Sequence, residues 1–255
     1  MVTIKTKEEI NILREGGKRH AFILRELAGM VKPGVTSLEL ENRARELIAE
    51  GGDEASFLNY KPFGAKRPYP AALCVSVNDE VVHGIPNEGD KVLKEGDIVT
   101  LDLGLTHKGL VTDSAVTVPV GKISPELTQL LEVTKKALYA GIRVAKGGNK
   151  TGDIGEAVSR MAIPFKYGVV EELSGHGVGY SVHEDPYVPN YGTAGEGDIL
   201  TPGMVIAIEP MFNLGTRRVK LGDDGYTYKT ADGNPSAHFE HTVVITKSGA
   251  EILTQ

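Results

Sequence analysis

The sequence predicts a mixed α/β (α+β) protein built from two similar halves, and two observations support this prediction. Helical and strand patterns occur in the order helix, helix, strands, and this order then occurs a second time. Residues 93–102 (LKEGDIVTLD) also align without a gap on residues 200–209 (LTPGMVIAIE). In the same order along the chain, His83 and His176 each precede a glycine and an apolar residue. We therefore expect one domain, residues 1–255, whose halves (about 1–120 and 121–255) face each other across a pseudo-two-fold axis.

The composition limits the class of protein. With 255 residues, 40% of them hydrophobic and 24% charged, the chain is typical of an ordinary soluble globular protein. Its net charge of −6, with acidic and basic residues interspersed, argues against direct nucleic-acid binding. The lone Cys74 excludes an internal disulfide and a cysteine-based zinc finger. Because neither a membrane-span pattern nor a signal-peptide pattern is present, we expect a cytoplasmic protein without membrane contact.

Two helices are expected in the first half. A capping-box pattern at residues 6–9 precedes apolar residues at helical spacing, and this helix should end near Val31. A second capping box at residues 36–39 opens a helix that should close at Gly51. The following loop, residues 59–70, is too rich in Pro, Gly and aromatic residues for regular structure, and loops of this kind are often functional. A strand is then expected at residues 71–77, followed by residues 78–80 and the segment VVHGIP at 81–86.

The second half repeats this order. Ser124 at the N-cap and Pro125 at the first helical position open a helix that should run to about residues 147–148. The next helix should extend from Thr151 to about residues 167–168. The segment that leads into this helix, residues 144–151, resembles residues 31–37 with one insertion. Residues 31–37 also lead into a helix. The remainder is expected to be strand and loop, including residues 203–211 and 237–246.

A β-hairpin at residues 96–118 carries two aspartates. If His107 and Lys108 form the two-residue loop, Asp102 pairs with Asp113 directly across the hairpin. Directly opposed like charges destabilise a sheet, and two carboxylates in a dry site cannot both stay ionised without a cation. For two aspartates taken alone, the alternative is one turn cap and one solvated side chain.

Three further residues complete a candidate metal site. Glu209 is the repeat counterpart of Asp102 at the end of an apolar strand, where a buried carboxylate needs a partner or a metal. Strand alternation over residues 237–245 makes Glu240 an inward-pointing acid. His176 lies between two glycines, which would let backbone and ligand approach closely.

Four carboxylates and one imidazole are the ligands that a pair of divalent transition ions prefers. Two such ions can generate hydroxide at neutral pH and stabilise both ends of a hydrolytic displacement. Taken singly, each carboxylate could instead cap a turn or join an ion pair, and a lone histidine is more often structural. The repeat register favours the whole set over these single alternatives. The candidate ligands are Asp102, Asp113, His176, Glu209 and Glu240.

The remaining histidines and the cysteine are interpreted differently. His20 and His107 are interpreted as residues of a helix face and of a turn. His238 and His241 flank the last of the candidate acids, and whether either orients it stays open. Cys74 is expected to be a buried or pocket-wall thiol, because nothing near it in sequence would activate it as a nucleophile.

At these residues the chain resembles the type I methionine aminopeptidases of the bacterial kind, over nearly its whole length. The resemblance implies the pseudo-symmetric pita-bread fold of creatinases and aminopeptidases, with an antiparallel sheet covered by helices. It rests on the paired Asp102 and Asp113 and on the motifs SVNDEVVHGIP (76–86), SGHGVGYSVHEDP (174–186), IEPMF (208–212) and FEHT (239–242).

The resemblance also implies residue roles. The five candidate residues become ligands of two divalent ions, cobalt, manganese, iron or zinc, with Asp113 and Glu240 as bridges. Glu209 becomes the proton shuttle. His83 and His183 become non-ligand groups at the scissile peptide, where His83 bonds the amide and His183 donates to the oxyanion or holds the peptide. The residues implied as walls of a methionine pocket are Tyr69 and Cys74, with Tyr60 and Phe63.

The implied activity is metal-dependent removal of the initiator methionine from nascent proteins and peptides when the second residue is small. Nascent polypeptide N-termini are the implied partners, with the ribosome as a further candidate, and we expect a monomer. Two alternatives stay open, an X-Pro dipeptidase-like enzyme and a non-catalytic peptide-binding homologue.

Two features depart from the family's pattern. The loop at residues 61–68 is longer than the usual bacterial pattern, so its pocket residues cannot be assigned one by one. Leu103 and Gly104 stand where many relatives carry a small hydroxyl residue that helps hold a monovalent ion, so we do not predict that ion. The interval from His183 to Glu209 is too short for the insert of type II enzymes.

Overall fold

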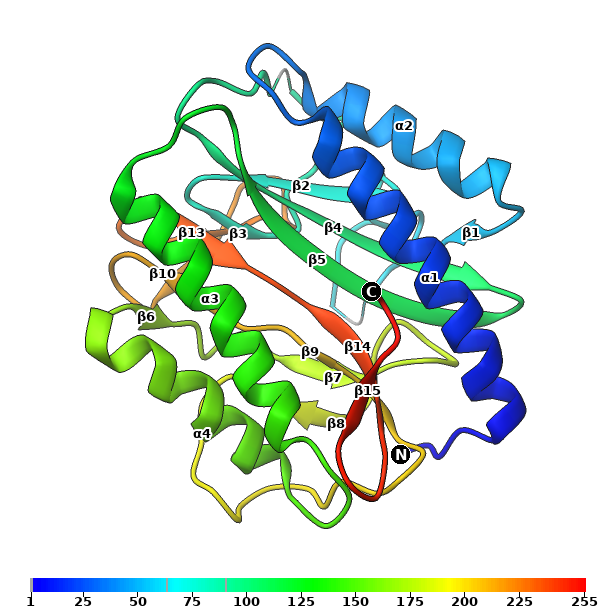
Figure 1. Cartoon of the computed structure of the whole chain (residues 1–255). Coiled ribbons are helices and arrows are strands. Elements are labelled where there is room, and N and C mark those ends of the chain that lie inside the picture. The colour runs from blue at the N-terminus through cyan, green and yellow to red at the C-terminus, as the bar shows by residue number, and fades with distance from the viewer. Residues whose placement is uncertain (1, 63, 90) are drawn as a thin grey trace.

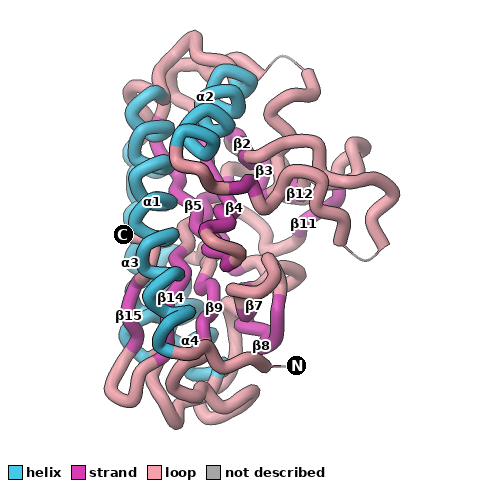
Figure 2. Tube along the Cα trace, turned by 90° about the vertical axis from the view of Figure 1, so that its right-hand side faces the viewer, coloured by secondary structure: helices cyan, strands magenta, loops and turns pink. Residues whose placement is uncertain are grey.

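The two halves of the chain lie side by side, with helices on one face of the strands. A computed structural model describes the chain except for residues 1, 63 and 90. In Figure 1, α1 and α2 cover the strands of the first half, and α3 and α4 cover those of the second. The side view in Figure 2 places these helices on one side and a loop-rich region with β11 and β12 on the other. The helices therefore leave the opposite face of the strands to the loops.

The helices begin where the capping patterns predict. The Thr6 side chain accepts a hydrogen bond from Glu9 N, and that of Thr36 accepts one from Glu39 N. In both cases the glutamate side chain accepts a hydrogen bond from the N-cap backbone in return, which completes the capping box. The first helix ends before Val31, as predicted. The helices are α1 (Lys7–Met30), α2 (Ser37–Glu50), α3 (Pro125–Val144), α4 (Thr151–Ala162) and the 3₁₀ helix η1 (Ile163–Phe165).

Both later helices end earlier than the sequence predicts. The predicted end of α3 at residues 147–148 is wrong, because the N–H groups of Gly147 and Gly148 donate to Thr246 O and Leu200 O instead of to the helix. The predicted end of α4 at residues 167–168 is also wrong. Pro164 has no N–H to continue the α-helical ladder, and a 3₁₀ turn follows instead.

Antiparallel strands build the sheets that carry the site. The main sheets have the orders β1-β4-β2, with β5 on the free side of β4, and β15-β14-β9-β7-β8, while β13-β10-β6 and β11-β12-β3 form smaller ones. The strands are β1 (Glu54–Ala55), β2 (Leu73–Val77), β3 (Glu80–Val82), β4 (Ile98–His107), β5 (Leu110–Pro119), β6 (Gly168–Val169), β7 (Gly175–Gly177), β8 (Glu184–Val188), β9 (Val205–Ile208), β10 (Met211–Asn213), β11 (Val219–Leu221), β12 (Tyr228–Thr230), β13 (Ser236–His238), β14 (His241–Ile245) and β15 (Ala250–Ile252).

Two segments leave the extended conformation next to site residues. In the segment 81–86 the strand β3 ends at Val82, because His83 takes a left-handed φ of 58° that breaks the extended backbone. The strand expected at residues 237–246 is divided into β13 and β14, which pair with different neighbours, β10 and β9. Glu240 lies at this division.

The hairpin register differs from the prediction. His107 pairs with Leu110, so Lys108 and the glycine after it form the two-residue loop. Both loop residues have positive φ (49° and 81°), the geometry that favours a glycine at the second position. Asp102 therefore pairs with Ala115 rather than with Asp113. The two aspartates are diagonal neighbours on one face of the hairpin, and the predicted directly opposed pair is wrong.

The internal repeat is confirmed by the backbone. In the repeat alignment Ile98 corresponds to Val205, and these residues begin β4 and β9. Two positions before each strand, Gly96 and Gly203 have nearly the same positive φ, 95° and 94°. Each half also contains an isolated antiparallel bridge at corresponding positions. It joins Thr36 to Val92 in the first half and Lys150 to Ile199 in the second.

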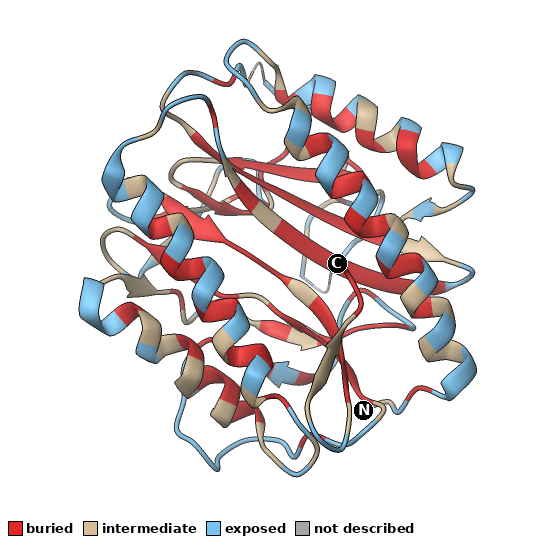
Figure 3. Ribbon diagram, viewed as in Figure 1, coloured by how far each residue is buried: buried red, intermediate tan, exposed pale blue. Residues whose placement is uncertain are grey.

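Each half has an apolar core between its helices and its strands. In Figure 3 the buried residues of these helices and strands are red. In the first half, Leu27 and Leu40 of the helices pack with Leu101 of β4. In the second half, Leu138 and Ile154 pack with the strands around Ile206. Burial of such side chains is the main force that holds helices on a sheet. No helix among the described residues combines the length and the hydropathy of a membrane span.

Candidate metal centre

The predicted site residues meet in one cavity between the two halves. The cavity has a volume of about 500 Å³. Its walls include residues of the loop-rich region that lies opposite the helices (Figure 2). All predicted ligands, both non-ligand histidines and the described pocket residues line it, namely Asp102, Asp113, His176, Glu209, Glu240, His83, His183, Tyr69, Cys74 and Tyr60. Phe63, which the sequence suggested as a further wall, lies outside the described residues.

The hairpin of the first half supplies Asp102 and Asp113, both buried. Gly104 lies opposite Asp113 on the partner strand. A Cβ atom at Gly104 would lie 2.6 Å from Cε1 of Phe57, because the phenyl ring packs against this glycine. The ring thus occupies the space beside the aspartate, and a larger residue at position 104 would collide with it.

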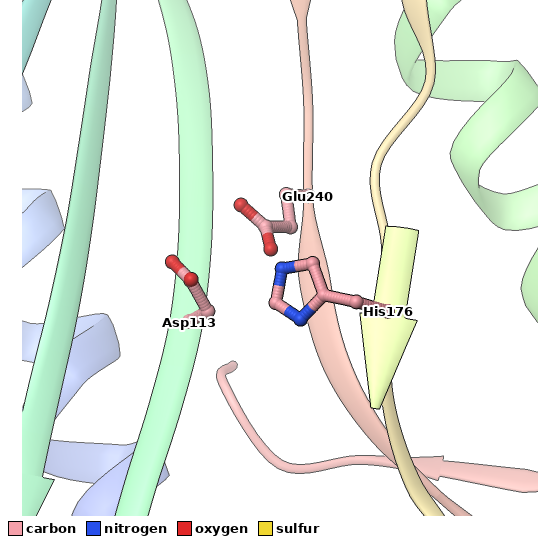
Figure 4. Close-up of side chains that lie close together, drawn as sticks. All are labelled: Asp113, His176 and Glu240. Carbon is pink, nitrogen blue, oxygen red and sulfur yellow. The ribbon is translucent and has the colours of Figure 1, made fainter. Parts of the chain in front are cut away.

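The second half supplies His176, Glu209 and Glu240. Figure 4 shows Asp113, His176 and Glu240 pointing toward one another from three separate segments. One potential ligand atom from each of these three side chains lies within 4.8 Å of the others. Nε2 of His176 lies 3.4 Å from Oε1 of Glu209, which adds the fourth residue to the group.

Glycines on either side of His176 let neighbouring strands approach it. A Cβ at Gly175 would lie 2.3 Å from Ala207 O, and one at Gly177 would lie 2.1 Å from Asp185 O. Only glycine fits at such distances. The GHG pattern therefore serves close packing of the backbone, as the sequence suggested, and it fixes the imidazole at the cavity.

Direct hydrogen bonds join the two halves beside the ligands. Asp113 N donates to Thr242 Oγ1 (2.9 Å), and the Thr242 hydroxyl donates to Asp113 O (2.7 Å). Ser114 Oγ donates to Glu240 O (2.7 Å), and Glu240 N donates to Ala115 O (2.9 Å). These buried bonds fix the backbone of Glu240 relative to that of Asp113.

The carboxylates lie in an environment that disfavours their charge. Burial raises the pKa of Asp102 to about 7. Burial, together with the neighbouring carboxylates, raises the pKa values of Asp113, Glu209 and Glu240 well above their usual range. A divalent cation would reverse this effect, because it stabilises the ionised form of each acid.

The hydrogen-bond inventory agrees with a cation site. Among the described residues, Asp102 Oδ1, Asp113 Oδ1 and Glu240 Oε1 are buried without a hydrogen-bond partner. Buried polar atoms are rarely left unpaired, and a missing ion is one explanation. Burial also lowers the pKa of His176 to about 3, so its imidazole is neutral and can ligate. The residues present therefore fit a metal centre.

The two histidines whose roles the sequence left open, His238 and His241, lie in different places in the structure. His238 is buried in the cavity, with Nε2 3.8 Å from Glu209 Oε2 and 3.9 Å from Glu240 Oε2. His241 lies outside the cavity wall, and its Nδ1 lies 3.0 Å from Thr254 Oγ1. Strand alternation already places His238 on the face of Glu240, so this was the signal in the sequence for its position.

The structural interpretations of His20 and His107 agree with their contacts. Nδ1 of His20 lies 3.0 Å from Thr112 Oγ1, which joins α1 to the hairpin. Nδ1 of His107 lies 2.7 Å from Asp53 Oδ1 beside the turn. Neither histidine lines the cavity.

The cavity wall beside the acids is apolar and aromatic. The Tyr69 hydroxyl donates to Gly84 O (3.0 Å), and its ring meets that of Tyr226 edge to face at 5.2 Å between centroids. Burial raises the pKa of the Cys74 thiol well above its ordinary value, so this cysteine is a wall residue and not an activated nucleophile. Phe57 and Tyr226 also line the cavity and were missed, since no motif in the sequence marks them.

The loop at residues 61–68 forms contacts with the opposite wall of the cavity. Arg67 pairs with Glu88, and its Nη2 also donates to Asp224 O (3.2 Å). The Tyr226 hydroxyl donates to the carbonyl oxygen of Arg67. The loop at residues 61–68 is therefore held, through Arg67, against the segment that carries Tyr226.

Comparison with known proteins agrees with this site. The profile of metallopeptidase family M24 matches residues 11–247. The methionine aminopeptidase of Aquifex aeolicus is 46% identical over 100% of this chain and 99% of its own length. Methionine aminopeptidase 1 of Bacillus subtilis is 45% identical, with both chains covered completely.

Solved structures separate the close from the distant relatives. The crystal structure of the methionine aminopeptidase of Thermotoga maritima matches with a TM-score of 0.94 and 42% identity, covering 100% of both chains. The Xaa-Pro dipeptidase of Bacillus anthracis matches with a TM-score of 0.78 and 24% identity, covering 99% of this chain and 62% of its own, which is a likeness of fold. The expected pita-bread fold is confirmed, and the chain belongs to metallopeptidase family M24.

Proposed function

We propose that this protein is a methionine aminopeptidase that removes the initiator methionine from proteins and peptides whose second residue is small. The observation that carries the proposal is the group of buried acids and one imidazole, with unpaired oxygens, beside an apolar cavity wall. Full-length relatives that carry the name methionine aminopeptidase support the same activity.

Two divalent ions would be held by Asp102, Asp113, His176, Glu209 and Glu240. When bound, such ions lower the pKa of water and polarise the scissile carbonyl. Cobalt, manganese, iron and zinc all suit a set of carboxylates with one imidazole. The mutual repulsion of the buried acids supports the presence of more than one positive charge.

The chain's own residues then move protons and hold the peptide. Glu209 is the proposed proton shuttle, because a carboxylate beside the reacting groups can accept and return a proton, and burial raises its pKa. His183, exposed at the cavity mouth, donates to the developing oxyanion or holds the peptide. His83 is neutral, because burial lowers its pKa to about 4, and it bonds the scissile amide.

The methionine side chain would occupy the apolar part of the cavity. Tyr69 and Cys74 form its wall, together with Phe57 and Tyr226. An aromatic and sulfur-containing lining suits a flexible thioether, because both are soft and polarizable.

The wider setting of the enzyme follows from this activity. We expect residues 1–255 to act as a single catalytic domain, with halves of about 1–120 and 121–255 that are both needed because each supplies ligands. Nascent polypeptide N-termini in the cytoplasm are the expected substrates. Docking at the ribosome and a monomeric state complete the proposal.

A peptide assay tests the proposal. Metal-free protein is loaded in turn with manganese, iron, cobalt or zinc and incubated with Met-Ala-Ser, Met-Lys-Ser and the dipeptide Met-Pro. We expect methionine release from Met-Ala-Ser with at least one metal and little from Met-Lys-Ser. Preference for Met-Pro would favour an X-Pro dipeptidase. No release from any peptide with any metal would favour a non-catalytic binding protein.

A further inference from the structure

Two neighbouring histidines of the cavity, His176 and His183, differ in the group that lies next to their Nδ1 atoms. The rings of His176 and His183 lie 4.4 Å apart between centroids and meet edge to face at 66°. Nδ1 of His176 lies 2.9 Å from Gly177 O, whereas Nδ1 of His183 lies 2.8 Å from the Tyr60 hydroxyl. A carbonyl oxygen can only accept a hydrogen bond, but a hydroxyl can also donate one.

The carbonyl fixes the tautomer of His176. Because Gly177 O can only accept, Nδ1 of His176 must carry the proton. Nε2 of the neutral ring is then an unprotonated acceptor, and this atom is the one that faces Glu209 Oε1 at 3.4 Å. His176 thus presents a lone pair where a metal ligand needs one.

The Tyr60 hydroxyl favours the opposite tautomer of His183, with the proton on Nε2. If the ring N–H donated to Tyr60, the tyrosine proton would have to go to solvent, because the hydrogen bonds of the described residues include no other acceptor for it. If the hydroxyl donates to Nδ1, both groups are satisfied and the ring proton lies on Nε2. Burial raises the pKa of Tyr60, so the hydroxyl keeps the proton that this arrangement requires.

Tyr60 is held in place despite the long loop that follows it. Tyr60 N donates to Phe57 O (2.9 Å), Tyr69 N donates to Tyr60 O (2.8 Å), and Asn59 N donates to Tyr69 O (2.9 Å). These bonds close the base of the loop, so the length of residues 61–68 does not change the position of the tyrosine. The same two tyrosines also line the cavity, which links the wall of the pocket to His183.

We propose that Tyr60 is a positioning residue that donates its hydroxyl proton to Nδ1 of His183 and thereby holds this histidine as an Nε2–H donor. Two adjacent imidazoles then have opposite tautomers, with His176 as a lone-pair ligand and His183 as a hydrogen-bond donor toward the peptide. Protonated Nε2 cannot ligate an ion, which explains how His183 stays available to the substrate so close to a ligand. The role toward the peptide rests on the proposed function, but the tautomer does not.

Tyr60→Phe tests the proposal, because it removes the hydroxyl and keeps the ring. In zinc-loaded, ¹⁵N-labelled protein, long-range ¹⁵N–¹H spectra report which ring nitrogen of each histidine carries the proton. The His183 signals are identified by their loss in His183→Asn. We expect wild-type His183 to be protonated at Nε2 and the variant to show both tautomers. For Met-Ala-Ser, kcat should fall about tenfold with little change in KM, which corresponds to one lost hydrogen bond.

Tyr139→Phe is the matched control. The Tyr139 hydroxyl lies 3.5 Å from Nε2 of His241, a second tyrosine–histidine pair that lies outside the cavity. This control should change neither the His183 signals nor kcat. A proton on Nδ1 of wild-type His183, or an unchanged His183 tautomer in Tyr60→Phe, would overturn the proposal. Absence of methionine release from the wild-type protein would count against the proposed function alone, because the ¹⁵N pattern is read without turnover.

Discussion

The two halves of the molecule position their site residues by different means. Asp102 and Asp113 project from β4 and β5, strands of 10 residues each that pair along their whole length. His176, Glu209 and Glu240 lie in or beside β7, β9 and β14, which have 3, 4 and 5 residues. A long hairpin fixes its side chains through its own register, whereas short strands need contacts from outside.

For Glu240 and β14 those outside contacts come from the hairpin itself. Thr242 exchanges two hydrogen bonds with the backbone of Asp113, and Glu240 is bonded through both its N–H and its carbonyl to the next two residues of β5. We infer that the first half acts as a framework on which the segment carrying Glu240 is positioned. Changes in the two halves should therefore have different consequences.

The largest effect is expected from Glu209, the proposed proton shuttle in the second half. Glu209→Gln should lower kcat by at least about a hundredfold, because an amide cannot transfer the proton. The fold should remain, since the substitution removes a carboxylate that is costly to bury. Release of methionine from Met-Ala-Ser measures the first effect and thermal unfolding the second. Glu132→Gln, an exposed glutamate of α3 paired with Lys136, is the control and should retain full activity. A loss of only a fewfold in Glu209→Gln would reject the assigned role.

Metal removal tests whether the halves share one cation site. Unfolding in denaturant is compared with a chelator and with manganese at a hundredfold excess over its Kd. Binding to the folded state alone should raise the free energy of unfolding by about 2.7 kcal/mol. A metal that leaves the unfolding midpoint unchanged would contradict a site built from both halves.

Thr242→Val tests the docking of the second half on the hairpin. Loss of the hydroxyl leaves Asp113 N and O without their buried partner, at an expected cost of about 1–3 kcal/mol in the free energy of unfolding. Metal affinity, measured by calorimetry, should fall as well, because Asp113 and Glu240 lose their alignment.

Thr106→Val is the matched comparison within the first half. The Thr106 hydroxyl lies 2.7 Å from Ser56 Oγ, and both residues belong to the first half. Its removal should lower stability but leave metal affinity unchanged. Equal effects of the two substitutions on metal affinity would remove the distinction between framework and docked half.

The last prediction concerns the framework and is a pH dependence of stability. Burial lowers the pKa of His20 to about 3, against 6.5 for an unperturbed histidine. As pH falls below 6.5 the unfolded chain binds a proton that the folded chain does not, so stability present above pH 6.5 is lost toward pH 3. His20 alone should contribute a slope of about 1.4 kcal/mol per pH unit in this window.

His20→Gln should remove that slope. Denaturant unfolding of chelated wild-type and variant protein at pH 4.5 to 6 measures the difference, while between pH 7 and 8 the two curves should run parallel. Equal slopes in the acidic range would mean that His20 is not kept neutral by the fold.

Much of the site was predictable from the sequence, because its signals are local. The repeat of residues 93–102 at 200–209 paired Asp102 with Glu209, and strand alternation pointed Glu240 inward. The register of the hairpin was predicted wrongly because loop residues were chosen without their φ angles. In the structure, positive φ at Lys108 and Gly109 moves Asp113 opposite Gly104.

Other features depend on tertiary contacts that leave no pattern in the chain. The contact between Phe57 and Gly104 and the bond between Tyr60 and His183 join residues far apart in sequence. The side chain of His238 could be placed on the face of Glu240, but its distances to two acids required the fold. Sequence patterns thus predict which residues face the cavity, and packing determines how they meet.

Methionine release measured against metal added per chain tests whether the buried acids form a two-metal hydrolytic site. Metal-free protein is titrated with cobalt, and free methionine from Met-Ala-Ser is followed at each ratio. We expect no turnover without metal and a rate that rises and levels off by about two ions per chain, as for a two-metal hydrolase. Turnover by the metal-free protein, or full metal binding without methionine release, would rule out such a site.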